Sequence, residues 1–147
     1  MITCKRNLFV IELSYHKQGV IDVKIQKSSE DYLETMLILK ETNGYIRSID
    51  VAKFMNVTKP SVSYATKRLR EHGYITMADD GLITLTDSGM EIAKRMYDRH
   101  KLLSDFFIYM GVSEEVAKED ACKIEHDLSA ETFSVIEKYW NKINTKD

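Results

Sequence analysis

Between residues 43 and 88 the sequence alternates short helical segments with turn signals, and this alternation constrains the fold more than any other feature. Asn43-Gly44 stops one helix, Asn56-Val57-Thr58 forms a turn after a second, and Gly73 closes a third. Asp80-Gly81 then marks a hairpin between two β-prone runs. The sequence therefore predicts a helix over Ser48–Met55, a helix that contains Pro60 and reaches Glu71–His72, and strands at Tyr74–Met77 and Leu82–Leu85.

Helical patterns flank this stretch on both sides. The first begins at Ser28, where Ser28 and Ser29 can cap a helix and Ser28 and Asp31 have the spacing of a capping box. Beyond the hairpin, capping residues and glycines predict three more helices: from Thr86 or Ser88 to Met110, from Ser113 to about Asp127, and from Ser129 onward. The resulting order is typical of a mainly α fold in which a winged helix-turn-helix precedes a helical domain.

Composition narrows the class of protein. The 147 residues are 44% hydrophobic and 30% charged, which suits a globular core, and the formal net charge is −2. No apolar run approaches the roughly 18 residues of a membrane span, so a cytoplasmic protein is expected. Two cysteines, Cys4 and Cys122, lie far apart without CxxC spacing, which indicates no disulfide framework and suits a reducing compartment.

The first 27 residues stand apart from the rest. They carry five basic residues against two acidic ones, and Leu8–Leu13 and Val20–Ile25 could each form a short strand. The sequence assigns this extension no role.

A local basic stripe on the third helix predicts DNA binding despite the acidic total. Lys59–Glu71 holds four basic residues and one acidic residue, and in a winged helix-turn-helix this helix enters the major groove. The alternative is a solvated helix face, which the adjoining turn and hairpin disfavour. The wing tip, with Asp79 and Asp80, is expected to contribute little because carboxylates repel phosphate. The candidate DNA-binding residues are Lys59, Pro60, Ser61, Ser63, Tyr64, Lys67 and Arg68.

Several potential metal ligands share helical spacing. Cys122, Glu125 and His126 lie at i, i+3 and i+4, and Asp31 and Glu34 lie at i and i+3. A mixture of thiolate, imidazole and carboxylate donors can hold a first-row transition metal. Each residue also has an ordinary interpretation, such as a small buried cysteine or a surface ion pair. Spacing alone leaves open whether these groups converge.

The chain resembles the diphtheria toxin repressor / manganese transport regulator (DtxR/MntR) family of metal-dependent transcriptional repressors, over roughly Ser28 to Trp140. The resemblance is carried by SSEDYLETM, GYIRSIDVAKFMNVTKPSVSYATKRLREHGYI, LITLTDSGMEIA, RHKLL and EDACKIEHDLS. It implies a metal site built from the first, long and fifth helices, with Asp31, Glu34, His100, Cys122, Glu125 and His126 as ligands.

The resemblance also implies departures from the family pattern. Cys122 stands where manganese-type members often have glutamate, whereas Asp31 matches them, so the site is a hybrid. A second site of iron-type members would place ligands at Ser104 and Lys118, neither of which fits, and no SH3-like domain is expected before the chain ends at Asp147. The expected parts are an N-terminal extension (1–27), a winged helix-turn-helix DNA-binding domain (28–95) and a helical metal-binding and dimerisation domain (96–147).

The expected function is that of a repressor, not an enzyme, activated by Mn(II) or Fe(II), with Co(II), Ni(II) or Zn(II) able to substitute in vitro. The many apolar residues of the last three helices favour a homodimer, which would bind a palindromic operator in double-stranded DNA. Metal would fix the DNA-binding part against the dimerisation part, and metal-uptake genes are the expected targets. The alternatives are a metal-independent winged-helix regulator and, less favoured because HExxH is missing, a small metalloenzyme.

Overall fold

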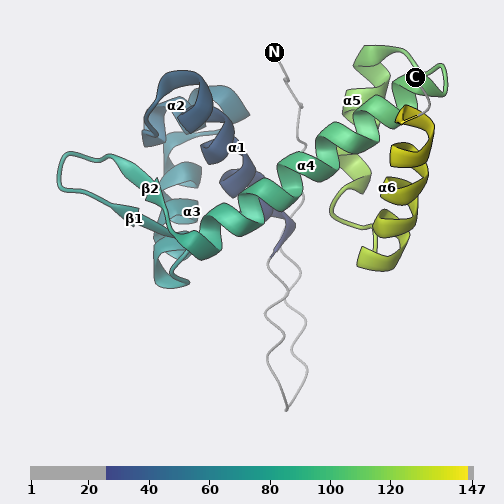
Figure 1. The fold of residues 1–147 in the computed structure, drawn as a ribbon. Helices are drawn as coiled ribbons and strands as arrows, with labels where there is room; N and C mark the ends of the chain where they lie inside the picture. Colours follow the sequence, from purple (N-terminus) through teal and green to yellow (C-terminus); the bar gives the residue numbers. More distant parts are fainter. Residues whose placement is uncertain (1–25, 146–147) are drawn as a thin grey trace, which may run out of the picture.

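A computed structural model describes residues 26–145, and it shows the predicted order of elements (Figure 1). The strands expected at Leu8–Leu13 and Val20–Ile25 lie outside the described residues. The elements are α1 (Lys27–Asn43), α2 (Ser48–Met55), α3 (Lys59–Glu71), β1 (Ile75–Met77), β2 (Ile83–Leu85), α4 (Asp87–Tyr109), α5 (Glu114–Ile124) and α6 (Ala130–Asn144).

The turn between α2 and α3 is set by local chemistry. Asn56 adopts a left-handed conformation with φ of 54°, which asparagine tolerates better than most residues. The Thr58 side chain then accepts a hydrogen bond from the Ser61 amide at 3.3 Å and caps α3. Pro60 sits in the first turn, where its missing N–H leaves no hydrogen bond unmade. The predicted helix-turn-helix is confirmed in this detail.

The hairpin pairs β1 and β2 antiparallel, with Ile75 opposite Leu85. At its tip the Asp80 carboxylate accepts a hydrogen bond from the Leu82 amide at 3.0 Å, so an acidic side chain serves the turn. The segment before α2 adds to the sheet, because the Ile83 amide donates to the Ile46 carbonyl at 2.9 Å. This contact fixes the wing relative to the helix-turn-helix.

The core of the N-terminal lobe is centred on α1. Leu33 and Met36 of α1 are completely buried, and Val51, Val62 and Ile83 pack from α2, α3 and β2. Removing this much apolar surface from water is the main stabilising contribution to such a lobe.

Helix α4 is the long element that joins the two ends of the molecule, with the wing lobe at one end and α5 and α6 at the other (Figure 1). Its first turn packs directly on the hairpin, since a Cβ built on Gly89 would lie 2.0 Å from the Tyr74 carbonyl oxygen. Aromatic contacts close the far end, where Phe106 and Tyr109 pack edge-on against Trp140 of α6.

Two predicted helix ends were wrong. Helix α1 begins at Lys27 with Gln26 as its cap, because the Ser29 amide already donates to the Gln26 carbonyl at 2.7 Å; neither serine caps it. Helix α5 ends at Ile124, short of the expected Asp127. Its end is fixed by Arg99, which draws the carbonyls of Glu125 and Leu128 toward α4 through hydrogen bonds of 3.0 and 3.1 Å.

Candidate metal centre and nucleic-acid interface

A buried histidine of α4 meets a buried carboxylate from the turn after α5. The Nδ1 atom of His100 lies 2.9 Å from Oε2 of Glu125, and neither side chain is more than 7% exposed. Although burial alone raises the pKa of Glu125, its contacts with His100 and His126 lower that pKa on balance. Glu125 is therefore held as a carboxylate, the form that a metal requires.

His126, the next residue, faces three carboxylates. Its Nδ1 lies 2.8 Å from Oε2 of Glu30, while its Nε2 lies 2.7 Å from Oδ1 of Asp31 and 3.3 Å from Oε1 of Glu125. Burial alone lowers the pKa of His126, but these carboxylates outweigh it and raise the pKa to about 11. The cluster thus concentrates negative charge around one imidazole.

Several donor atoms in this cluster are buried without a hydrogen bond among the described residues. Within residues 26–145, Nε2 of His100 is buried and has no hydrogen-bond partner, while Nε2 of His126 and Oε1 of Glu125 are buried and have only the ion-pair contacts given above. Leaving such polar atoms unsatisfied is costly in a protein interior. A cation at the point where the donors converge would satisfy them, so the residues present fit a metal.

The donors form two groups that share Glu125. In the described part of the chain, one ligand atom each from Asp31, Glu125 and His126 lie within 4.8 Å of one another, and so do those of His100, Cys122 and Glu125. Imidazole, thiolate and carboxylate together suit first-row transition metals. The residues come from α1, α4, α5 and the turn after α5, so segments far apart in the sequence contribute to each group.

Two expected ligands need a separate account. Glu34 is buried one turn along α1 from Asp31, but neither donor group includes it. Cys122 belongs to a group, yet it is disulfide-bonded in this structure, contrary to the expectation of reduced cysteines. Because a thiolate is the metal-ligating form, Cys122 can serve only once that bond is reduced.

Three charged residues that the sequence interpretation did not select hold the centre in place. Glu30 contacts His126 and also accepts from Nη2 of Arg95 at 3.2 Å. Arg99 ties the turn after α5 to α4 and stacks over Phe133 of α6 at 4.9 Å. The sequence offered one signal that could have identified two of them: Glu30 directly precedes the expected ligand Asp31, and Arg99 directly precedes the expected ligand His100.

The candidate DNA-contacting residues lie along α3. Lys59, Pro60, Ser63, Lys67 and Arg68 are exposed, and Tyr64 is 60% exposed. Ser61 is less exposed than these residues, being half-buried. Its hydroxyl lies 2.8 Å from that of Thr58 and takes part in the cap. The opposite face of α3 is anchored in the core by Val62 and Leu69. One face of the helix is therefore free to meet phosphates and base edges.

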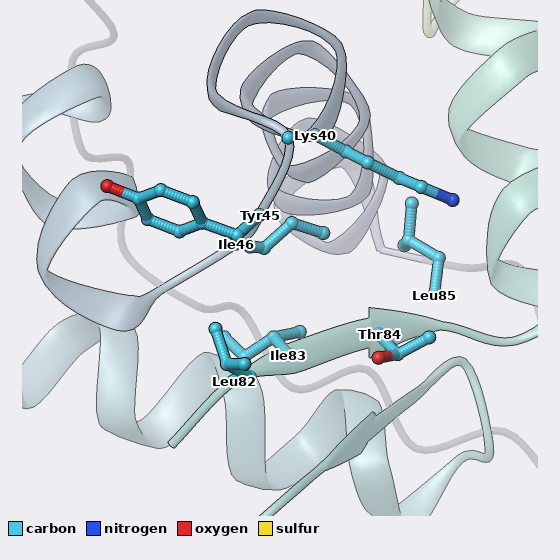
Figure 2. Close-up of a pocket in the computed structure, with 8 residues that line it drawn as sticks. Lys40, Tyr45, Ile46, Leu82, Ile83, Thr84 and Leu85 are labelled. Carbon is cyan, nitrogen blue, oxygen red and sulfur yellow. The ribbon is translucent and has the colours of Figure 1, made fainter. Parts of the chain in front are cut away.

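A small hollow opens elsewhere in the same lobe. It measures about 160 Å³ and lies between the end of α1 and strand β2 (Figure 2). Figure 2 shows Lys40 and Thr84 at one end and Tyr45 at the other, around a mostly apolar wall. It contains none of the expected metal ligands, so it is separate from the metal centre.

The far end of the molecule exposes an apolar surface on α4, α5 and α6. Helix α6 has no buried residue within the single chain. The surface, called the α4–α6 face below, comprises Ile108, Tyr109, Met110, Val116, Val135 and Tyr139, each between 39% and 64% exposed. No helix of the described residues is long and apolar enough to cross a membrane.

Comparison with known proteins gives two family matches that divide the chain. Residues 24–82 match the N-terminal DNA-binding domain of iron-dependent repressors. Residues 86–147 match the metal-binding and dimerisation domain of the same repressors.

Similar proteins agree with these matches. An uncharacterised HTH-type transcriptional regulator of Methanocaldococcus jannaschii is 36% identical over 83% of this chain and 99% of its own length. The transcriptional regulator MntR of Escherichia coli is 30% identical over 98% of this chain and 95% of its own. Among solved structures, the manganese regulator SloR superposes with a TM-score of 0.69 at 26% identity over 77% of this chain, which spans 53% of that longer one. A manganese-dependent transcriptional repressor in complex with manganese gives a TM-score of 0.70 at 26% identity, over 77% of this chain and 52% of its own.

Proposed function

Since the chain belongs to the DtxR/MntR family of metal-dependent transcriptional repressors, which are regulators and not enzymes, we propose that it represses transcription when a divalent transition metal fills the centre around Glu125. Its partners are double-stranded DNA and a second copy of the chain. The observation that carries the proposal is the pair of donor groups that share this one buried carboxylate.

The two groups divide the work of holding metal. Asp31, Glu125 and His126 form one set of donors, and His100, reduced Cys122 and Glu125 form the other. Because the carboxylate oxygens of Glu125 face different histidines, the residue is suited to serve both groups. We include Glu34 as a ligand that would have to move toward the centre, since it is buried one turn from Asp31. The metal supplies positive charge that offsets the crowded carboxylates.

The position of the donors explains how metal would control DNA binding. Asp31 lies on α1, in the core of the winged helix-turn-helix, whereas Cys122, Glu125 and His126 belong to the dimerisation part. Residues of the two parts would hold the same metal, and in a dimer this shared ligation would fix the spacing of the two α3 helices. Half-sites of a palindromic operator about one DNA turn apart can then be bound together. These residues would favour the DNA-competent arrangement if they bind metal more tightly in it than in other arrangements.

For the metal we favour Mn(II) or Fe(II), with Co(II), Ni(II) or Zn(II) able to substitute in vitro. Carboxylates suit Mn(II), a thiolate suits softer ions, and this centre offers both. The names of relatives include a manganese regulator and a manganese-dependent repressor, which supports the same choice. Metal-uptake genes are the targets we propose, and the cytoplasm is the compartment.

For DNA recognition we propose the exposed face of α3. Lys59, Lys67 and Arg68 would neutralise phosphates, while Pro60, Ser61, Ser63 and Tyr64 at the start of the helix would approach base edges. The acidic wing tip would stay outside the direct contacts, because Asp80 is engaged in its own turn.

The test is DNA binding as a function of metal. Operator sequences are selected from a random duplex library, in parallel with Mn(II) and with chelator, and affinity for the selected duplex is then measured at fixed salt, without oxygen and with a reductant. We expect tight binding with Mn(II) or Fe(II) and weak binding with chelator. Glu125→Gln keeps the side-chain volume but removes the shared charge, so its DNA affinity should no longer respond to metal. Equal wild-type affinity with metal and with chelator would refute the proposal.

A further inference from the structure

We propose that Glu30, held by Arg95, is a positioning residue that sets the orientation of the His126 imidazole for metal binding. The inference rests on the proposed function, since it concerns the same centre. It extends that function to two residues outside the donor groups.

The geometry joins three elements at one carboxylate. Oε2 of Glu30 lies 2.8 Å from Nδ1 of His126, and Oε1 accepts from Nη2 of Arg95 at 3.2 Å. The side chains of His126 and Glu30 are only 2% and 14% exposed, so their contact is shielded from water. Glu30 thus connects α1 to α4 and to the turn after α5.

The chemistry of imidazole gives this contact its role. A neutral imidazole carries one N–H and one lone pair, and the partner of one nitrogen decides which atom is left to bind metal. With Nδ1–H donating to Glu30, the proton that a metal would replace is the one on Nε2, which faces Asp31 and Glu125 at 2.7 and 3.3 Å. Glu30 therefore aims His126 at the donor group that contains it. Such outer partners of metal-bound histidines commonly contribute about 10–100-fold in affinity.

Arg95 makes the carboxylate a fixed support. It holds the oxygen that His126 does not use, which limits rotation of the Glu30 side chain. A second tie lies beside it, because Nζ of Lys27 donates to the Lys123 carbonyl at 3.0 Å. The first turn of α1 is thereby kept against the end of α5, where His126 follows.

The experiment measures Mn(II) binding to the reduced 147-residue chain, from the electron paramagnetic resonance signal of free Mn(II). Glu30→Ala should bind Mn(II) about tenfold more weakly or worse. Glu30→Gln retains an oxygen that can accept from Nδ1–H and should stay close to wild type. The matched control is Glu41→Ala, which changes an exposed glutamate of the same helix.

A second readout separates positioning from a purely structural effect. In the Zn(II)-loaded protein the Nδ1–H proton of His126 should give a slowly exchanging NMR signal in the wild type and in Glu30→Gln, and that signal should be lost in Glu30→Ala. Urea unfolding in chelator reports how far each variant weakens the fold without metal.

The Mn(II) affinities and NMR signals of the Glu30 variants decide between a positioning role and no such role. Weak Mn(II) binding and loss of the N–H signal in Glu30→Ala alone support the proposal. Wild-type affinity in Glu30→Ala, or equal losses in Glu30→Gln and Glu30→Ala, overturns it. If Glu30→Ala does not fold, Glu30→Asp replaces it, because its shorter side chain cannot keep both contacts, and wild-type affinity there has the same meaning. Failure of the wild type to bind Mn(II) would refute the proposed function instead.

Discussion

Glu125 shows how one residue can carry two jobs in a small centre. Its side chain is fully buried, and a buried carboxylate survives only where positive or hydrogen-bonding groups surround it. Here His100 contacts Oε2 of Glu125 and His126 contacts Oε1, while Arg99 donates a hydrogen bond to the backbone carbonyl of Glu125. The same arrangement leaves Nε2 of His100 without a hydrogen bond among the described residues and gives Nε2 of His126 only carboxylate ion pairs. Both metal binding and the stability of the fold therefore require an ionised carboxylate at this position with positively charged or hydrogen-bonding partners around it.

Cys122 is the residue at which metal preference can be altered. Cys122→Ser keeps the size of the side chain but replaces a soft sulfur donor by a hard hydroxyl. In reduced protein we expect affinity for Zn(II) and Co(II) to fall more than affinity for Mn(II), so that the Zn(II)/Mn(II) affinity ratio decreases. Competition titrations of the wild type and of Cys122→Ser against a common chelator measure that ratio. An unchanged ratio would show that Cys122 does not ligate the metal.

At this scale the sequence predicted residue types better than their geometry. The i, i+3, i+4 spacing suggested that Cys122, Glu125 and His126 share one helix face, yet α5 ends before the last two. They converge because Arg99 pulls the turn toward α4, a contact across 26 residues that spacing cannot reveal. Glu30 was passed over for a related reason. An acidic residue in the first turn of a helix has an ordinary role there, and only the fold brings it to His126.

Among elements, α4 is the one whose placement matters most, because it carries His100 and joins both ends of the molecule. Its start was predictable from Thr86, which caps it through the Gly89 amide at 3.2 Å. Its packing was not predictable, since a glycine in a helix pattern has several possible reasons. The structure supplies the reason: the Tyr74 backbone occupies the space where a side chain would begin.

Gly89→Ala tests that packing. An added Cβ would lie 2.0 Å from a backbone oxygen, so either α4 or the hairpin has to shift. We expect the free energy of unfolding to fall by about 2 kcal/mol, within the range for overpacked sites. Urea unfolding of the metal-free protein measures this free energy. The control is Glu91→Ala, which changes an exposed residue in the same turn of α4. A loss no larger than that of the control would contradict the close approach.

Taken whole, the molecule has two surfaces with different tasks at opposite ends of α4. The basic, exposed face of α3 lies in one lobe, and the α4–α6 face lies at the other end (Figure 1). Exposed apolar surface of this kind is stable in water when a second copy covers it. The dimerisation domain matched over residues 86–147 includes every residue of that face. The metal centre lies between the two surfaces, and its ligands come from both the DNA-binding and the dimerisation part. A movement of one part relative to the other would therefore change the geometry of the centre.

This placement makes a quantitative prediction about the whole molecule. If metal and DNA favour the same arrangement, the factor by which Mn(II) tightens operator binding must equal the factor by which the operator tightens Mn(II) binding. Typical couplings of this kind are about 5–150-fold. The two factors are measured separately, by DNA titration with and without Mn(II) and by Mn(II) titration with and without the selected duplex, at one salt concentration because phosphate contacts are salt-dependent. Glu30→Gln should keep the coupling, whereas Glu125→Gln should abolish it. If the operator leaves Mn(II) affinity unchanged while Mn(II) still increases retention on DNA, metal acts outside the binding equilibrium, for example by aggregating the protein, and the centre around Glu125 does not link the two parts.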